Sequence, residues 1–325
     1  MLAFICPGQG SQSVGMAHDI YEQYPAARER LDSLDAAADF PLLQTMFEGP
    51  DEVLTATENA QPALVAHSLA VAAILQEHGI KPDMAAGHSL GEYSALAIAG
   101  AIAPAEAVKL VRLRGELMAE AGAETGGAMA AIIGLDEQKV LEAIHLLVTG
   151  LFAIDSDSLG ADYLAQFLPV SIANYNSESQ IVITGEDEAV AAVSEVALEL
   201  GAKRVIPLQV SGAFHSRLMK PAAEKLATIL ETVELCDAAI PVVANVDAAA
   251  QTEAAKLKQG LVRQLTEPVL WKQSVACMVQ AGADSFVEVG AGQVLAKMLQ
   301  RSGMDAVILN TGTAAAVGET IGQLT

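Results

Sequence analysis

The chain has 325 residues, 52% of them hydrophobic, and its 18 Lys and Arg against 40 Asp and Glu give a formal net charge of −22. This size allows a substantial buried core in one large domain, or in one large and one small domain. Such a negative charge opposes non-specific binding to nucleic acid and to anionic membranes, so neither is expected as a partner. The apolar runs are too short to cross a bilayer and no basic leader is present, which predicts a cytoplasmic protein.

Cysteine and histidine are too scattered to predict a metal site. The three cysteines, Cys6, Cys236 and Cys277, lie far apart and form neither a zinc pattern nor a disulfide framework. They are expected to be buried apolar side chains in a reducing compartment. The six histidines do not pair at metal-ligand spacing, so no metal is expected.

The N-terminal part of the chain alternates short apolar strands with helices. Leu2–Cys6 is predicted to be a buried strand, followed at 7–12 by a glycine-containing loop. A helix is predicted for 61–77, with Pro62 in its first turn. The next predicted elements are a strand at 84–86 and helices at 90–99 and 104–121.

The most informative stretch is Gly-His-Ser-Leu-Gly at 87–91, between a predicted strand and a predicted helix. It fits the G-x-S-x-G nucleophile elbow, a sharp turn that lifts the hydroxyl of Ser89 into an open cleft. Small residues at Gly87 and Gly91 allow strand and helix to pack closely around a strained turn. The alternative is a chance match in a chain rich in glycine and alanine, and the position between strand and helix favours the elbow.

The middle of the chain predicts a separate unit whose elements follow the order β-α-β-β-α-β, typical of a split βαβ or ferredoxin-like unit. These elements are expected at 128–134, 136–147, 170–174, 180–184, 188–200 and 203–207. The unit, at 125–207, is predicted to be inserted into a larger domain formed by 1–124 and 208–325. An extended segment near 149–169, interpreted as a loop with a short helix, has no functional interpretation.

Beyond the insertion, strands and helices alternate again. The predicted elements are helices at 217–231, 253–265, 271–280 and 293–301 and strands at 241–244, 285–289 and 306–309. Together with the N-terminal part they predict an α/β fold with a mostly parallel sheet covered by helices on both faces. A ligand cleft is expected at the carboxyl ends of its strands.

A serine hydroxyl becomes a good nucleophile only when a base removes its proton. His215, in a loop just before a predicted helix, is the best candidate base and is expected on the same side of the sheet as the elbow. The alternative is a histidine in a solvated loop. His88 points off the same turn as Ser89 and is interpreted as a cleft-lining residue. The four other histidines lie on or near predicted helices and are interpreted as structural.

Several motifs, in this order, resemble one known family along nearly the whole chain. They are PGQGSQ at 7–12, QPAL at 61–64, AGHSLGEYS at 86–94, RLRG at 112–115, GAMAA at 127–131, ANYNS at 173–177, GAFH at 212–215 and VRQL at 262–265. The family is that of the malonyl-CoA:acyl carrier protein transacylases, acyltransferases that load malonyl groups for fatty acid synthesis. The resemblance implies an α/β-hydrolase-like large subdomain with an inserted ferredoxin-like small subdomain, in agreement with the order of elements above.

By this resemblance, Ser89 is the nucleophile that carries the malonyl ester, and His215 is the base that then protonates the leaving thiol. In the family a backbone carbonyl orients the histidine, at a position that Gln264 matches. The backbone N–H groups of Gln9 and Leu90 are expected to form the oxyanion hole. A fixed donor of this kind contributes about 3–4 kcal/mol to the stabilisation of the transition state.

The resemblance also implies that Arg114 binds the free carboxylate of the malonyl group, because a planar guanidinium pairs with a carboxylate bidentately. An acetyl group would leave this arginine unpaired, so the pocket is expected to reject it. Composition alone favours an alternative, in which Arg114 lies on a solvated helix face with Arg112 and Glu116. Phe214 is expected to narrow the pocket. The other expected pocket residues are His88, Gln61 and Asn174.

The implied reaction is ping-pong: malonyl-CoA acylates the serine, free CoA leaves, and the phosphopantetheine thiol of an acyl carrier protein takes the malonyl group. Malonyl-CoA is thus a substrate, no permanently bound cofactor is expected, and the protein is expected to be a monomer. Because the carrier is typically acidic, as this chain is, docking is predicted at a local basic patch. Its members are Lys203, Arg204, Arg217, Lys220, Lys297 and Arg301.

Three other functions stay open on the sequence. A stand-alone acyltransferase of a polyketide synthase would look much the same. A serine esterase or thioesterase would use the same serine and histidine but has no need of a buried guanidinium. A non-catalytic carrier-binding protein would keep the fold alone. The segment near 149–169 departs from the family pattern, which is shorter there, and this departure bears on carrier docking rather than on the chemistry.

Overall fold

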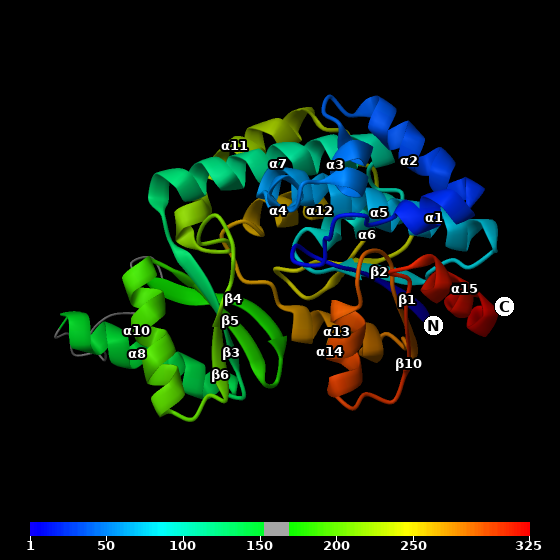
Figure 1. Cartoon of the computed structure of the whole chain (residues 1–325). Coiled ribbons are helices and arrows are strands. Elements are labelled where there is room, and N and C mark those ends of the chain that lie inside the picture. Colours follow the sequence, from blue (N-terminus) through cyan, green and yellow to red (C-terminus); the bar gives the residue numbers. More distant parts are fainter. Residues whose placement is uncertain (153–168) are drawn as a thin grey trace. The chain divides into compact units, whose positions relative to one another are not determined.

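The structure, a computed structural model, describes residues 1–152 and 169–325 (Figure 1). The chain forms two compact units. The first comprises Met1–Glu116, Thr228–Leu261 and Gln273–Thr325, and the second Leu117–Ala227 and Val262–Lys272. Apart from its ends, the predicted extended segment near 149–169 lies outside the described residues. Among the helices that are described, none is both long and apolar enough to span a bilayer.

The first unit is built on a six-stranded sheet with the strand order β10-β9-β1-β2-β7-β8. Its strands are β1 (Leu2–Cys6), β2 (Met84–Gly87), β7 (Val242–Val243), β8 (Ala250–Gln251), β9 (Ser285–Glu288) and β10 (Val307–Asn310). The neighbours β1 and β2, β1 and β9, β9 and β10, and β2 and β7 are all parallel, and β8 runs antiparallel to β7. The predicted α/β fold with a mostly parallel sheet is confirmed.

Helices cover this sheet, which explains why β1 is an unbroken apolar run rather than an alternating one. Figure 1 shows α5 and α6 on one face of the sheet and α13 and α14 on the other. The helices before the second unit are α1 (His18–Gln23), α2 (Pro25–Ala37), α3 (Leu42–Glu48), α4 (Asp51–Thr55), α5 (Thr57–Glu77), α6 (Gly91–Ile98) and α7 (Pro104–Thr125). Later in the chain come α11 (Lys220–Thr232), which begins in the second unit and ends in the first, α12 (Ala254–Arg263), α13 (Trp271–Gln280), α14 (Val294–Arg301) and α15 (Ala314–Leu324).

The start of helix α5 differs from the predicted start. The sequence pattern places Pro62 in the first turn of a helix that starts at Gln61, whereas the helix starts at Thr57 and contains Pro62 in its interior. The residue before it, Ala56, makes no side-chain capping bond, so the usual sequence signal for a helix start is missing. A proline inside a helix has no N–H for the carbonyl four residues earlier, here that of Glu58.

The second unit contains an antiparallel four-stranded sheet with the order β4-β5-β3-β6. Its elements are β3 (Ala128–Ile133), α8 (Glu137–Phe152), β4 (Val170–Ser177), β5 (Gln180–Gly185), α10 (Asp187–Glu199) and β6 (Arg204–Pro207). They follow the predicted β-α-β-β-α-β order. In Figure 1, α8 and α10 lie together on one face of this sheet. The core between them includes Ile132, Val140, Ile183 and Val193.

This unit reaches further along the chain than the range 125–207 predicted for the small subdomain. Two backbone contacts explain the extension. A Cβ on Gly122, near the end of α7, would lie 2.0 Å from the carbonyl oxygen of Ser211, so only glycine allows this approach. Val269 adds to the edge of β4, where it accepts from the N–H of Tyr175 at 2.9 Å and donates to the carbonyl of Ala173 at 2.8 Å. A short 3₁₀ helix, η2 (Arg217–Met219), precedes α11.

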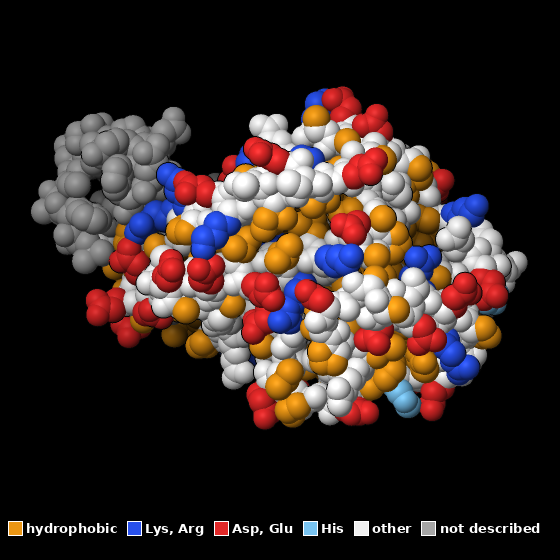
Figure 2. All heavy atoms as spheres, turned by 90° about the horizontal axis from the view of Figure 1, so that it is seen from above, with side chains coloured by type: hydrophobic (Ala, Val, Ile, Leu, Met, Phe, Trp, Pro, Cys, Tyr) orange, Lys and Arg blue, Asp and Glu red, His pale blue; other side chains and the backbone are white. Residues whose placement is uncertain are grey.

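Charged side chains are mixed on the surface. On the face drawn in Figure 2, Asp and Glu side chains are spread widely, and Lys and Arg occur among them rather than in one large field. Such a surface matches the strongly negative net charge. Any attraction for an acidic partner must therefore come from a small local group of basic residues.

Candidate active site

Ser89 lies at the carboxyl end of β2, in the turn that leads into α6. Its φ of 50° is in the left-handed region, which a residue with a Cβ occupies only under constraint. The turn depends on its glycines. A Cβ on Gly87 would lie 1.8 Å from the backbone of Gly91, and one on Gly91 would lie 2.1 Å from the carbonyl oxygen of Cys6. The close packing of strand and helix that the motif predicts is present.

Arg114 projects from α7 to the hydroxyl of Ser89 although its side chain is almost completely buried, at 1% exposure. Its Nη2 donates to Oγ of Ser89 at 3.2 Å, and its Nη1 donates to Oε1 of Gln61 at 2.8 Å. The guanidinium carbon is 5.4 Å from the centre of the Tyr93 ring. The alternative interpretation, a solvated helix face, is therefore wrong for Arg114. Gln61 lies in the predicted site and holds one end of the guanidinium.

The electrostatics of this pair favour an anionic ligand. Burial lowers the pKa of Arg114, and the neighbouring Tyr93 and Glu92 act in the opposite direction. Burial also raises the pKa of Tyr93 to about 12, so its phenol stays neutral. An arginine keeps its charge at neutral pH even when its pKa falls somewhat. The site thus places a poorly solvated cation beside the serine, and a cation of this kind binds a carboxylate strongly.

Two backbone N–H groups at the elbow are available to a ligand. Within the described residues, the N–H groups of Gln9 and Leu90 have no hydrogen-bond acceptor. The loop that carries Gln9 packs directly on the elbow, because a Cβ on Gly8 would lie only 2.6 Å from the carbonyl oxygen of His88. The side chain of Gln9 donates to the hydroxyl of Thr57 at 3.2 Å, which ties this loop to the start of α5.

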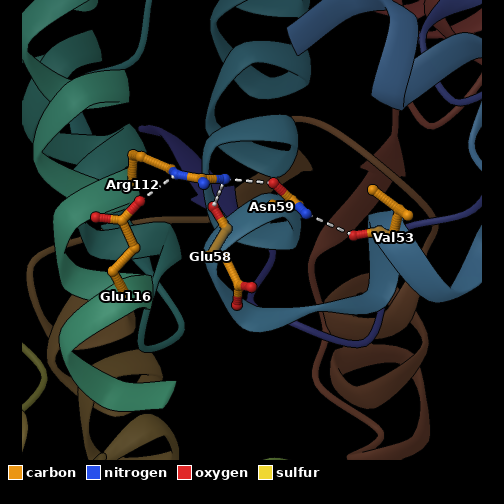
Figure 3. A network of polar contacts seen from close by, with 5 residues as sticks. All are labelled: Val53, Glu58, Asn59, Arg112 and Glu116. Carbon is orange, nitrogen blue, oxygen red and sulfur yellow. Dashed lines mark hydrogen bonds and ion pairs between the residues drawn. The ribbon is translucent and has the colours of Figure 1, made fainter. Parts of the chain in front are cut away.

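Figure 3 shows a second arginine of α7, Arg112, which links this helix to the start of α5. Its Nη1 donates to the carbonyl oxygen of Glu58 at 3.2 Å and to the side chain of Asn59. Its Nε donates to the Glu116 carboxylate at 2.6 Å, along the same helix. The Asn59 amide in turn donates to the carbonyl of Val53 at 2.8 Å. No function was predicted for Arg112 from the sequence.

The carbonyl of Glu58 is the one that Pro62 leaves without a helical donor, so Arg112 supplies the missing hydrogen bond. The two helices come very close here. A Cβ on Gly115 would lie 2.6 Å from Cα of Glu58. Arg112 and Gly115 therefore fix the crossing of α5 and α7 on either side of Arg114, and this crossing brings Arg114 to the elbow.

Asn245, which the sequence analysis did not single out, holds the elbow from behind. It follows β7, the parallel neighbour of β2, and is fully buried. Its Oδ1 accepts from the backbone N–H of Ser89 at 2.7 Å, and its Nδ2 donates to the carbonyl of Gly87 at 2.6 Å. No local motif marks this residue, since it lies 156 positions beyond the serine.

His215 lies in the second unit, with a φ of 58° and an exposure of 4%. Its Nδ1 is 2.7 Å from the carbonyl oxygen of Gln264. Because a carbonyl only accepts, this bond places the proton on Nδ1 and leaves Nε2 as the basic nitrogen. The contact with Gln264 is the one expected, and a solvated loop histidine is excluded. Ser89 belongs to the first unit, so the convergence of these two residues stays a prediction.

The other predicted site residues divide between the units. Gln61 and the half-buried His88 belong to the first unit, and Phe214 and Asn174, each 5% exposed, to the second. The residues proposed for carrier docking divide in the same way. Lys203, Arg204, Arg217 and Lys220 lie in the second unit, and Lys297 and Arg301 on α14 in the first. Of these, Arg217 forms an ion pair with Glu186.

The cysteines are free, but only partly as expected. Cys6 is buried, and burial raises the pKa of its thiol far above the ordinary value, so it is no nucleophile. Cys236 is exposed and Cys277 is partly buried, so the prediction of three buried cysteines is wrong. Cys236 lies in the segment after α11, and Cys277 lies within α13. Over 1–152 and 169–325, no three His, Cys, Asp or Glu side chains gather as metal ligands.

Comparison with known proteins shows the family to which the chain belongs. The acyl transferase domain family matches residues 3–324. A malonyl CoA-acyl carrier protein transacylase of Bacillus subtilis is 46% identical over 300 residues, which are 92% of this chain and 90% of that protein. The chain therefore belongs to the acyl transferase family and, within it, to the malonyl CoA-acyl carrier protein transacylases.

Solved structures support the same assignment. An acyl carrier protein S-malonyltransferase from Vibrio cholerae matches with a TM-score of 0.88 and 39% identity, covering 98% of this chain and 99% of its own. A malonyl-transacylase solved in complex with a type II polyketide synthase acyl carrier protein matches with a TM-score of 0.90 and 37% identity, covering 99% of each chain.

Proposed function

We propose that the protein transfers a malonyl group from malonyl-CoA to the phosphopantetheine thiol of an acyl carrier protein, in fatty acid synthesis. The observation that carries this proposal is the hydrogen bond between the buried guanidinium of Arg114 and the hydroxyl of Ser89. In a malonyl ester of the serine, one methylene separates the ester carbonyl from the free carboxylate. A cation that touches Oγ is therefore within reach of that carboxylate. The names of the relatives point to the same acyl group.

The serine attacks the thioester carbonyl of malonyl-CoA. The Oγ–C bond forms first and gives a tetrahedral intermediate, from which the C–S bond then breaks. The proton of Ser89 passes to Nε2 of His215 and then to the leaving thiolate of CoA. The N–H groups of Gln9 and Leu90 stabilise the negative charge on the carbonyl oxygen. The bond from Nδ1 to the carbonyl of Gln264 makes Nε2 the basic nitrogen, which takes up the proton and later returns it. The carrier thiol reverses the sequence and takes the malonyl group.

Several finer statements belong to the same proposal. The large unit is α/β-hydrolase-like and the β-α-β-β-α-β unit ferredoxin-like. The protein works as a cytoplasmic monomer without a permanently bound cofactor. The carrier docks through basic residues drawn from Lys203, Arg204, Arg217, Lys220, Lys297 and Arg301. That a structural relative was solved in complex with its acyl carrier protein supports a carrier as the partner. Phe214 and Asn174 shape the acyl pocket.

The structure also weighs against the alternatives. A simple esterase has no use for a buried guanidinium held by Gln61 against the nucleophile. A non-catalytic carrier-binding protein would not need two N–H groups at the elbow that lack an acceptor in the described part of the chain. A stand-alone enzyme of polyketide synthesis would use the same chemistry and differ only in its carrier.

Steady-state kinetics test the proposal. With malonyl-CoA and a holo acyl carrier protein varied together, we expect the parallel double-reciprocal lines of a ping-pong reaction and no activity in Ser89→Ala. Carriers of fatty acid and polyketide synthesis, compared at equal concentration, distinguish the two pathways by kcat/KM. Intersecting lines, or transfer that survives Ser89→Ala, would contradict the proposed mechanism.

A further inference from the structure

We infer that Asn245 is a positioning residue for the reaction, which holds the nucleophile elbow so that Leu90 rather than Ser89 offers its N–H to the substrate. This inference rests on the proposed function. It is carried by the contacts of one fully buried amide, whose two polar atoms are both used within the turn.

The side-chain amide of Asn245 bonds to a backbone donor and to a backbone acceptor at the same time. Its Oδ1 accepts from the N–H of Ser89, and its Nδ2 donates to the carbonyl of Gly87, two residues earlier. Aspartate could accept the first bond but would place a carboxylate oxygen against a carbonyl oxygen. Leucine has a similar shape and could make neither bond. Only an amide of this length satisfies both backbone groups.

The main chain of Asn245 bonds to the other side of the turn. Its N–H donates to Oε2 of Glu92 at 3.1 Å, and Glu92, 1% exposed, lies in the first turn of α6. The residue that follows β7 is thus bonded on both sides of the turn. It contacts Gly87 before Ser89, and Glu92 in the helix after Ser89. A turn held at both ends keeps the left-handed backbone of Ser89 in one conformation.

The direction of these bonds bears on catalysis. Since the N–H of Ser89 is turned back into the protein toward Asn245, it is not available to the reacting carbonyl oxygen. The next N–H along the chain, that of Leu90, has no acceptor among the described residues. Without the amide, the turn can rotate and the Leu90 N–H loses its fixed direction. Oxyanion stabilisation depends on such preorganised donors.

The experiment compares Asn245→Asp and Asn245→Leu with the wild-type protein in single-turnover acylation by malonyl-CoA. Both variants should acylate about 10²-fold more slowly, as expected for the loss of one oxyanion donor. The KM for malonyl-CoA should stay within about twofold, because the carboxylate contacts of Arg114 are untouched. The ratio of malonyl to acetyl transfer should also be unchanged.

Thr320→Val is the matched control. Thr320 is 2% exposed and donates to the carbonyl of Asn310 at 2.9 Å, a buried bond to the main chain away from the elbow. This variant should lower Tm without changing the acylation rate. If Asn245→Leu and Asn245→Asp are folded and acylate within threefold of wild type, the inference is wrong. It is also wrong if their loss of rate only follows the fraction of unfolded protein.

A serine-directed fluorophosphonate reagent separates this inference from the proposed function. The reagent needs the nucleophile and the oxyanion donors but not the malonyl site. If the wild-type protein reacts with it yet accepts no malonyl group, the proposed function fails. The Asn245 variants still decide the inference in that case. A reaction with the reagent about 10²-fold slower than wild type supports it, and an unchanged rate overturns it.

Discussion

Nη2 of Arg114 donates a hydrogen bond to Oγ of Ser89 over 3.2 Å, so the serine of the elbow and the buried cation are in direct contact. This contact joins two properties that a sequence motif treats separately. In the proposed function, the position of the hydroxyl and the preference for an acidic acyl group would depend on the same side chain. In the proposed reaction, a malonyl carboxylate would replace the hydroxyl as the stronger acceptor and release Oγ toward the thioester.

Arg114→Ala should reduce kcat/KM for malonyl transfer by about 10²–10³, since loss of a desolvated charge pair costs about 2–5 kcal/mol. Acetyl transfer should hold or rise, because acetyl has no carboxylate to pair. Initial rates with the two thioesters, on wild type and variant, measure this. Lys109→Ala, an exposed residue of the same helix, serves as the control. Should both transfers fall together, Arg114 would be a structural residue.

At Gln61, the substitution that keeps a hydrogen-bond acceptor should impair malonyl-CoA binding more than the one that removes it. Gln61→Leu removes the acceptor of Nη1 and should raise the KM for malonyl-CoA by about tenfold, the effect of one hydrogen bond to a charged group. Gln61→Glu keeps an acceptor but brings a carboxylate that neutralises Arg114 and repels the substrate. Its KM should therefore rise further than that of Gln61→Leu. A nearly normal KM in Gln61→Glu would show that the guanidinium is not the carboxylate site.

Arg112→Met should destabilise the first unit by about 1–3 kcal/mol, because it leaves the Glu58 carbonyl beside Pro62 without a donor. Urea unfolding measures the change. Lys109→Met, on the same helix and in an exposed pair with Glu106, should change the stability by less than about 0.5 kcal/mol. Equal effects of the two substitutions would mean that the carbonyl finds another partner.

The elbow was predictable because its signal is local. The glycines at 87 and 91 and the apolar strand before them lie within a few residues of Ser89, and their conformations follow from steric limits. The start of α5 was not, because no capping side chain marks it and an interior proline normally argues against a helix. A guanidinium from α7 supplies the hydrogen bond that the proline leaves unmade.

In the candidate site, too, some residues have a local sequence signal and others are recognised only in the folded structure. Family resemblance on short motifs was enough to select Ser89, Arg114 and Gln61, which the structure brings together. The function of Asn245 depends on the pairing of β7 with β2, which joins residues 156 positions apart. Such a contact has no periodicity or spacing in the sequence. The burial of Arg114 was also not predictable from composition. Its helix carries exposed charged residues as well, and such a composition indicates a solvated helix face.

Glu288 should make stability depend on pH. It is buried at the end of β9 and accepts from the N–H groups of Leu295 and Ala296 in the first turn of α14. Burial raises the pKa of Glu288 to about 7 from an ordinary value of 4.5, although these backbone bonds oppose the shift.

Because the folded protein holds this proton more tightly than the unfolded chain, the associated stability is present below pH 4.5 and is lost as the pH rises to about 7. Over that range the unfolding free energy of wild type, relative to Glu288→Gln, should fall by about 3 kcal/mol at most. Chemical denaturation at several pH values measures the difference. A difference that grows with rising pH would show that the carboxylate is favoured in the folded state.

The most direct test of the whole account is the mass of the intact protein after brief mixing with malonyl-CoA. We expect one malonyl adduct, located on Ser89 by peptide mapping, absent in Ser89→Ala and discharged when a holo acyl carrier protein is added. Arg114→Ala should form little of this adduct while still accepting an acetyl group. No adduct on the wild-type protein, or an adduct on another residue, would contradict the account.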